Sequence, residues 1–349
     1  MGTMRLIMKH PFKMLGLMNR KNVRVFFSMA RQFGFRTAFS NMRRVVGSSA
    51  SDADRMSSFE RYSVREFDGS VTEVPAPPDP LVSIIIPVYN QFEYTVYCVR
   101  SIVSNTEGIG FEVIIADDCS TDMTRQILEY LPGIRLVRTE RNQGFIRNCN
   151  NAAKVAEGRY LVFLNNDTLV KEGWLSALVD TMEDDPSVGL AGSKLIYPDG
   201  HLQEAGCIVW GDGTIWNYGR GMNPRLPEYN YLKDTDYVSG ASFIIRRDLW
   251  ERLGGFDEYY LPAYCEDTDL SFRVRKEGLR TVYQPRSEVV HFEGVSNGKS
   301  TQSGLKAYQV TNMQKLFDRW KDDLAGRPPQ GVDVFRARDC SFGKKIVAR

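Results

Sequence analysis

The sequence predicts an α/β protein with a mostly parallel central sheet covered by helices. Two observations lead to this prediction. Short apolar runs alternate with helical stretches from residue 81 onward, a spacing typical of parallel strands joined by crossover helices. The first run, residues 81–88, is also apolar at nearly every position, as expected for a strand buried on both faces. Ligands of such sheets bind beyond the carboxyl ends of the strands, so polar residues there are candidates for function.

The first half of this region gives regular elements. Strands are expected at 81–88, 111–116, 134–137 and 159–164, and helices at 94–104, 124–131 (capped by Asp122), 145–157 and 174–183. The second half is less regular. Residues 200–235 are rich in Gly, Tyr, Trp and Asn and predict a loop-rich substrate wall. Extended pieces are expected at 189–195, 237–246, 281–284 and 289–292, with helices at 248–253 and 267–278.

The flanking sequence has a different character. Residues 1–46 read as a basic, amphipathic helical extension, and residues 47–80 as a Ser- and Pro-rich linker to the domain at 81–300. Residues 301–349 are expected to form a C-terminal helical segment and tail. Because residues 343–349 resemble the start of an unpaired strand, we expect a further domain after them.

Charge is unevenly distributed along the chain. The whole protein has a net charge of +2, yet residues 1–50 contain ten Lys or Arg and no Asp or Glu. This favours an anionic membrane surface as a partner. The alternatives are that the extension packs on the acidic remainder of the chain or mediates contacts in a homo-oligomer. Nucleic acid is not expected as a partner.

The cysteines and the apolar segments indicate in which cellular compartment the protein is expected. Six scattered cysteines without a C-x-x-C pair favour a reducing environment over a disulfide framework. No apolar run reaches 18 residues, and basic residues interrupt the N-terminal segment, so neither a transmembrane helix nor a signal peptide is predicted. We therefore expect a cytoplasmic protein, peripheral at the inner face of the membrane.

Three predicted strands end in polar clusters, at residues 87–90, 117–120 and 165–167. Any one of them is also explained as an ordinary turn, but together they predict one crevice. Acidic residues there suit Mg²⁺ or Mn²⁺, which bind carboxylate and phosphate oxygens. Asp167 is the first candidate ligand, and His291, at the end of an apolar run, is the second. A core histidine bonded to a carbonyl is the alternative for His291.

A further acidic group, Glu266-Asp267-Thr268-Asp269, opens a predicted helix. Acids at a helix N-terminus stabilise the helix dipole. A carboxylate there could instead act as a general base towards a sugar hydroxyl. The spacing alone does not separate these interpretations.

Several segments together resemble the family 2 inverting glycosyltransferases, which have the GT-A fold. The matching segments, in family order, are VSIIIPVYN (82–90), ADDCSTD (116–122), NQGF (142–145), LNND (164–167), GASFIIRR (240–247), GGFD (254–257), EDTDL (266–270) and HFEG (291–294).

The resemblance implies a role for each matching position. Tyr89 and Asp118 would hold the nucleobase, and Asp117, Asn142 and Gly144 would line the ribose wall. Pro87 and Asn166 complete the implied nucleotide site. Asp167 and His291 would bind Mn²⁺ or Mg²⁺, and Asp267 would be the general base. The implied acceptor pocket is bordered by Gly240, Ala241 and Glu266.

The resemblance implies an inverting transferase that moves a sugar from a nucleoside-diphosphate sugar to a glycan or lipid-linked acceptor, as in bacterial polysaccharide synthesis. The sequence departs from the family pattern at Asn165-Asn166-Asp167, where only one carboxylate stands in the DxD segment. The Q-x-x-R-W segment of membrane-embedded processive synthases is also missing, so a non-processive or weakly processive hexosyl- or deoxyhexosyl-transferase is expected.

The sequence lacks the motifs of two other classes of nucleotide-binding enzyme. A nucleotidyltransferase would carry a Gly-rich basic loop after the first strand, and a dinucleotide dehydrogenase would carry G-x-G-x-x-G; neither is present. A glycan-binding or scaffolding protein with weakened catalysis is the non-enzymatic alternative, and only the altered DxD segment favours it.

Overall fold

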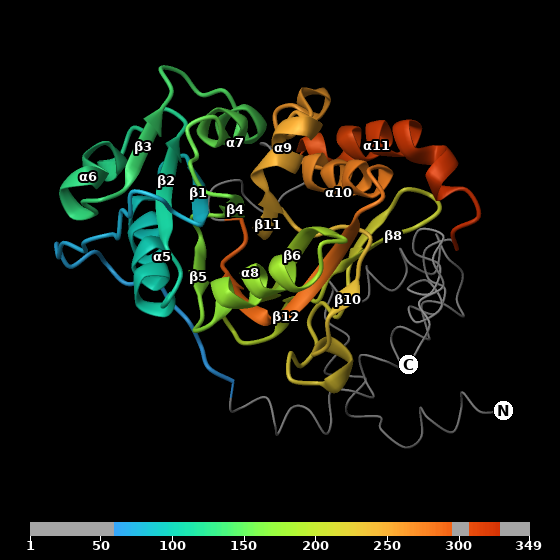
Figure 1. The fold of residues 1–349 in the computed structure, drawn as a ribbon, viewed down its shortest axis with the longest axis horizontal. Coiled ribbons are helices and arrows are strands. Elements are labelled where there is room, and N and C mark those ends of the chain that lie inside the picture. The colour runs from blue at the N-terminus through green and yellow to red at the C-terminus, as the bar shows by residue number, and fades with distance from the viewer. Residues whose placement is uncertain (1–58, 295–306, 329–349) are drawn as a thin grey trace, which may run out of the picture. The chain divides into compact units, whose positions relative to one another are not determined.

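The computed structural model describes residues 59–294 and 307–328, which contain one mixed sheet between two layers of helices (Figure 1). The predicted basic extension at 1–46, residues 47–58 of the linker and the C-terminal tail lie outside the described residues. No helix of the described part is long and apolar enough to cross a membrane.

The sheet is built mainly from strands that run in one direction. Its order is β10-β12-β6-β11-β4-β1-β2-β3. The parallel strands are β1 (Val82–Val88), β2 (Phe111–Asp117), β3 (Arg135–Arg138), β4 (Tyr160–Leu164), β6 (Val188–Ile196) and β12 (Arg280–His291). Strand β11 (Ser242–Arg246) is inserted antiparallel between β4 and β6. Because β11 is reversed, its amino end lies at the edge where the parallel strands have their carboxyl ends.

Short strands complete the sheet at its margins. They are β5 (Thr168–Val170), which pairs with β12, β7 (Leu202–Glu204), which pairs with β6, and β10 (Lys233–Asp234), which pairs with β12. Strands β8 (Cys207–Val209) and β9 (Ile215–Asn217) form a separate hairpin. The stretch 200–235, predicted to be loop-rich, thus contains four short strands, and these pack around a cluster that includes Trp210, Tyr218 and Tyr229.

Alternate residues of the buried strands face different helical layers. Ile84 and Ile86 belong to one apolar cluster and Ile85 to the other, as the two-residue period of a strand requires. The first cluster includes side chains of α5 (Phe92–Asn105) and α8 (Trp174–Asp184). The second includes α7 (Phe145–Ala153), α9 (Arg247–Leu253), α10 (Glu266–Lys276) and α11 (Tyr308–Leu324), which lie along the top of Figure 1.

Several boundaries differ from the sequence-based prediction. The two extended pieces expected at 281–284 and 289–292 are one strand, β12, which ends at His291 and whose register against β6 shifts between Gln284 and Glu288. Pro285 lies in this interval, and proline cannot donate a ladder hydrogen bond. The helix expected at 124–131 is a 3₁₀ turn, Met123–Gln126, followed by the short α6, Ile127–Tyr130. Asp122 caps it as predicted, accepting a bond from the Thr124 N–H.

The expected helix at 145–157 ends at Ala153, and the strand expected from residue 237 begins only at Ser242. The remaining short helices are Pro227–Tyr229 and Glu258–Tyr260.

Residues 59–80 lie against the domain. The Thr72 and Val74 N–H groups donate to the carbonyls of Tyr130 and Pro132, and the Val74 side chain is buried. Phe67 packs edge-on against Phe92 of α5. This part of the predicted linker therefore contributes to the core beside α5 and α6.

Candidate active site

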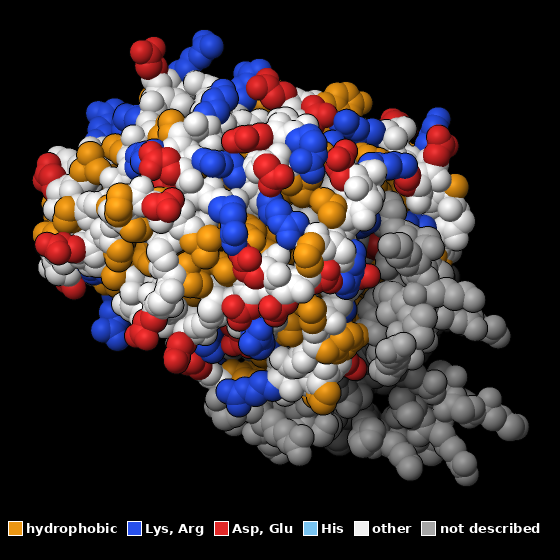
Figure 2. All heavy atoms as spheres, in the orientation of Figure 1, with side chains coloured by type: hydrophobic (Ala, Val, Ile, Leu, Met, Phe, Trp, Pro, Cys, Tyr) orange, Lys and Arg blue, Asp and Glu red, His pale blue; other side chains and the backbone are white. Residues whose placement is uncertain are grey.

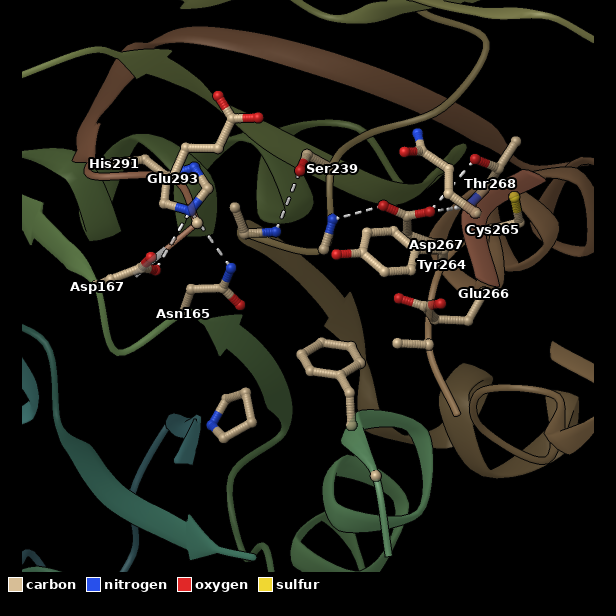
Figure 3. A pocket seen from close by; sticks show the side chains of 18 of the residues that line it. Asn165, Asp167, Ser239, Tyr264, Cys265, Glu266, Asp267, Thr268, His291 and Glu293 are labelled. Atoms are coloured by element: carbon tan, nitrogen blue, oxygen red, sulfur yellow. Dashed lines mark hydrogen bonds and ion pairs between the residues drawn. The ribbon is translucent and has the colours of Figure 1, made fainter. Parts of the chain in front are cut away.

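The polar strand ends converge on one pocket of about 430 Å³. The carboxyl ends of β1, β2, β4 and β12 and the amino end of β11 all reach this edge of the sheet. The start of α10 and residues of α11 also line the pocket. Figure 3 shows Asn165, Asp167, His291 and Glu293 on one side, Glu266, Asp267 and Thr268 on the other, and Ser239 between them.

Asp118 and the turn before α7 form one wall of the pocket. The buried Asp118 carboxylate accepts bonds from the Gln143 N–H (2.7 Å), the Gly144 N–H (2.8 Å) and the Thr139 hydroxyl (3.0 Å). Gly144 has a φ of 83°, and a Cβ at this position would lie 3.0 Å from Pro262. Glycine therefore allows the turn both its left-handed backbone and its close approach to the 261–265 loop.

The structure brings most of the predicted nucleotide residues together. Pro87, Tyr89, Asp118, Asn142, Gly144 and Asn166 all line the pocket. Tyr89 is 44% exposed, so its ring is open to a ligand, while the Asn166 amide donates to the Thr95 hydroxyl at 3.0 Å and is held in place.

Asp117 differs from the prediction and does not line this pocket. Its carboxylate is fully buried, forms an ion pair with Arg138 and accepts from the Ser120 N–H at 2.8 Å. Side chains alternate between the two faces along a strand. When Asp118 points into the crevice, Asp117 must therefore point away, and it orders the 118–120 turn instead.

Asp167 and His291 meet because two distant strands pair. Strand β5 starts at Thr168, which lies opposite His291 in the antiparallel register with β12. The Phe292 N–H also donates to the Asp167 carbonyl at 2.9 Å. As a result the His291 Nε2 lies 3.3 Å from the Asp167 Oδ1, and 3.5 Å from the Asn165 Nδ2.

Burial lowers the pKa of His291 while the Asp167 carboxylate raises it, and the net shift is upward.

The surroundings of His291 fit a metal ligand. Gln203 Nε2 lies 3.1 Å from the His291 Nδ1, while the buried Gln203 Oε1 has no hydrogen-bond partner. The oxygen and nitrogen of a side-chain amide can exchange places with little change in shape. With its oxygen towards His291, Gln203 would accept a hydrogen bond from the Nδ1–H of the imidazole. The lone pair on the His291 Nε2 would then face Asp167 and a cation.

The protein offers few ligands for such a cation. Within residues 59–294 and 307–328 no group of three or more His, Cys, Asp or Glu side chains could hold a metal ion. Mg²⁺ is commonly held by one or two carboxylates together with substrate phosphates and water. Asp167 and His291 therefore suit an ion that binds jointly with a diphosphate.

Asp267, in the first turn of α10, lies on the side of the pocket opposite Asp167 and His291. Its Oδ2 accepts from the Gly240 N–H at 2.9 Å, and its Oδ1 accepts from the Thr268 N–H at 2.7 Å. Burial raises the pKa of Asp267, and these bonds oppose the shift without cancelling it. A carboxylate with a raised pKa is a stronger proton acceptor.

Glu266 and Asp269, its neighbours in the motif, have different environments. Burial and the charge of Asp267 raise the pKa of Glu266 well above its ordinary value. Asp269 is fully buried and bonded to the Tyr260 hydroxyl, the Trp320 indole and Arg273. Of the three acids in this motif, Asp267 is the one that lines the pocket and is oriented by backbone N–H groups from both sides. Gly240 and Ala241 line the pocket beside it, as expected.

Other pocket residues were not identified from the sequence. Glu204 of β7 is buried beside the pocket, and burial raises its pKa to about 7. Its carboxylate accepts from the Asn217 amide at 2.7 Å and from the Ser239 N–H at 3.3 Å. Arg220 and Glu293 line the pocket near His291. Glu204 and Arg220 lie within the segment predicted as loop, where periodicity gives no signal, whereas Glu293 belonged to the recognised HFEG segment.

The chain is similar to known glycosyltransferases in sequence and in fold. Residues 83–253 match glycosyl transferase family 2. The O-antigen biosynthesis protein RfbC of Myxococcus xanthus is 33% identical over 62% of this chain, which spans only 18% of that protein. The N-acetylglucosaminyl-diphospho-decaprenol L-rhamnosyltransferase of Mycobacterium tuberculosis (strain ATCC 25618 / H37Rv) is 29% identical over 59% of this chain and 75% of its own length.

The solved structure of GalNAc-T7 with UDP, GalNAc and Mn²⁺ shares the fold. Its TM-score is 0.56 at 17% identity, and the match covers 70% of this chain and 50% of the other. The mixed sheet and its flanking helices are those of the GT-A fold. Residues 83–253 therefore form a glycosyl transferase family 2 domain.

Proposed function

We propose that the protein is a metal-dependent, inverting glycosyltransferase, which moves a sugar from a nucleoside-diphosphate sugar to a hydroxyl group of a glycan or lipid-linked acceptor. The observation that carries the proposal is the arrangement of one pocket. A polar wall at Asp118, the Asp167–His291 pair and the Asp267 carboxylate all face the same space. These groups match the three parts of a donor: base, diphosphate and reacting sugar.

The donor nucleoside would bind against the wall formed by Pro87, Tyr89, Asp118 and the 142–144 turn. Asp118 already accepts three hydrogen bonds, and a carboxylate has about four acceptor positions. One position remains to accept a bond from a base N–H, while the Tyr89 ring offers a stacking surface.

The diphosphate would lie beside Asp167 and His291, which would hold Mg²⁺ or Mn²⁺ together with its oxygens. When bound, this ion supplies positive charge to the leaving diphosphate. His291 and Asp167 contribute by orientation, since both are almost fully buried and fixed by the β5–β12 pairing.

Asp267 would remove the proton from the acceptor hydroxyl. The Gly240 and Thr268 N–H groups fix its orientation, and Oδ2, which accepts only the Gly240 bond, keeps capacity for a further bond. Attack on the sugar from the face opposite the diphosphate breaks the sugar–phosphate bond in one step, which inverts the anomeric carbon. Gly240, Ala241 and Glu266 would border the acceptor.

The setting we propose is bacterial polysaccharide synthesis, because one relative is an O-antigen biosynthesis protein and another a rhamnosyltransferase for a lipid-diphosphate acceptor. We also propose a cytoplasmic location with peripheral membrane attachment through residues 1–46. Attachment would bring the pocket close to a lipid-linked acceptor.

The release of nucleoside diphosphate from a panel of UDP-, dTDP- and GDP-sugars tests the proposal. Mn²⁺ should stimulate release, and EDTA should abolish it. Asp167→Asn and His291→Ala should each weaken donor binding and mimic EDTA. Binding of a donor without turnover, with any acceptor tried, would favour the catalytically weakened binding protein. Full activity in EDTA would show that the site works without a metal.

A further inference from the structure

The charges around the pocket pose a physical problem for the proposed donor. Five carboxyl side chains line it: Asp118, Asp167, Glu266, Asp267 and Glu293. Among the described residues that line it, Arg220 is the only Lys or Arg. A diphosphate brings further negative charge into this space. A single divalent ion on Asp167 and His291 would leave the pocket with little net attraction for it.

Arg220 lies at the metal side of the pocket. It follows β9 in a turn between Gly219 and Gly221, whose φ values are 77° and 76°. The Arg220 Nη2 lies 2.9 Å from one carboxylate oxygen of Glu293 and 3.3 Å from the other. Glu293 is two residues after His291, so this ion pair borders the predicted metal ligands.

The guanidinium is held in place yet remains accessible. The Tyr197 hydroxyl donates to the same Glu293 carboxylate at 3.0 Å, and the Arg220 guanidinium carbon lies 5.7 Å from the centre of the Tyr197 ring. The bonds to Glu293 use one nitrogen of Arg220, whereas a guanidinium has five N–H donors in a planar fork. The side chain is 51% exposed, so donors are available to a ligand.

We propose that Arg220 binds the diphosphate of the donor beside Asp167 and His291, and that Glu293 and Tyr197 position it. This inference rests on the proposed function, because it requires a nucleoside-diphosphate ligand. Arginine is suited to this task, since its fork matches two phosphate oxygens and its charge persists at every physiological pH. The guanidinium also stabilises the diphosphate as it leaves, which makes it a second cationic group beside the metal.

Binding of a nucleoside diphosphate and of the matching monophosphate separates this role from a structural one. Calorimetry with UDP, dTDP and GDP, in Mn²⁺, first identifies the diphosphate that the wild-type chain binds. Arg220→Gln should weaken binding of that diphosphate about tenfold or more, the usual loss for a hydrogen bond to a charged group. Binding of the monophosphate should change little. Arg220→Lys, which keeps the charge but loses the fork, should fall between Arg220→Gln and the wild type.

Arg225→Gln is the matched control, because Arg225 is an exposed arginine in the same connection that does not line the pocket. It should leave both affinities unchanged. Equal diphosphate affinity in Arg220→Gln and the wild type would overturn the assignment, as would equal weakening of both ligands. Failure of the wild-type chain to bind any of the three diphosphates would instead overturn the proposed function.

Discussion

Glu266 and Asp267 are adjacent carboxyl groups with different surroundings. Both have a raised pKa through burial, but that of Glu266 is raised much further because it also feels the Asp267 charge. Asp267 is stabilised as an anion by the Gly240 and Thr268 N–H groups. These surroundings suit Glu266 to acceptor binding and the oriented Asp267 carboxylate to proton removal.

A pair of amide substitutions tests this division. Asp267→Asn should lower transfer about 10²-fold or more, the usual contribution of a positioned general base, while donor binding is kept. Glu266→Gln keeps the shape of the side chain, and we expect it to retain most of the activity because Glu266 takes no proton in the proposed reaction. Initial rates of nucleoside-diphosphate release at pH 7.5 give the comparison, with thermal melting as the check on folding. Loss in Glu266→Gln with activity kept in Asp267→Asn would exchange the two roles.

The raised pKa of Asp267 also predicts a pH dependence. A base must be deprotonated, so kcat/KM should fall as the pH drops through the pKa of Asp267, and this acid limb should lie above the ordinary Asp value. Thr268→Val removes a hydroxyl that bonds to the carboxylate, so the limb should move to higher pH. A pH–rate profile of both proteins measures the shift. A limb at the ordinary Asp value, unchanged in Thr268→Val, would contradict the assignment.

At the scale of elements, helix α11 supports the loop that carries the catalytic motif. Asn312 is fully buried, and its amide nitrogen donates to the carbonyls of Tyr260 (2.6 Å), Ala263 (2.8 Å) and Tyr264 (3.1 Å). The loop then passes through Tyr264 and Cys265, which have left-handed φ values of 78° and 73°. A non-glycine residue adopts this conformation only when its surroundings hold it there.

We therefore expect Asn312 to position the start of α10. Asn312→Asp keeps the shape but loses the N–H donors, so a carboxylate would face three carbonyl groups. The loss should be about 1–3 kcal/mol of unfolding free energy, and kcat should fall more than nucleotide affinity. Gln314→Ala, an exposed change on the same helix, is the control. Urea unfolding and steady-state kinetics provide both measurements, and unchanged values for Asn312→Asp would show that α11 is not needed for the loop.

At the scale of the whole molecule, charge separates the described body from the N-terminal extension. On the face shown in Figure 2, basic and acidic side chains are interspersed. The first 50 residues, by contrast, contain ten basic and no acidic residues. Near an anionic membrane each Lys or Arg contributes about 1 kcal/mol of binding free energy.

The full chain should float with anionic vesicles at low salt and dissociate at high salt, because exposed charges are screened. A chain that begins at residue 59 should not float. This start retains Phe67 and Val74, which pack on the domain, so it is a better control than a start near residue 80. If the full chain stays in solution at low salt, the extension has another role.

Much of the site could be predicted from the sequence because parallel strands place their carboxyl ends at one edge. The apolar runs and the polar residues that follow them were enough to bring Tyr89, Asp118 and Asp167 to one crevice. His291 was predicted from its place at the end of an apolar run and Asp267 through the family resemblance, and both line the same pocket. Asp117 was misassigned because residue type alone does not tell which face of β2 it occupies.

The α/β class, the family resemblance and the polar residues at the strand ends could all be predicted from the sequence alone. They follow from local periodicity and from motifs of contiguous residues. Only the tertiary structure decided the reversed β11, the β5–β12 pairing that joins Asp167 to His291, and the approach of Arg220, Glu204 and Asn312 to the site. Those contacts join residues far apart in the chain. They arise from sheet register and packing, which no local pattern of residues encodes.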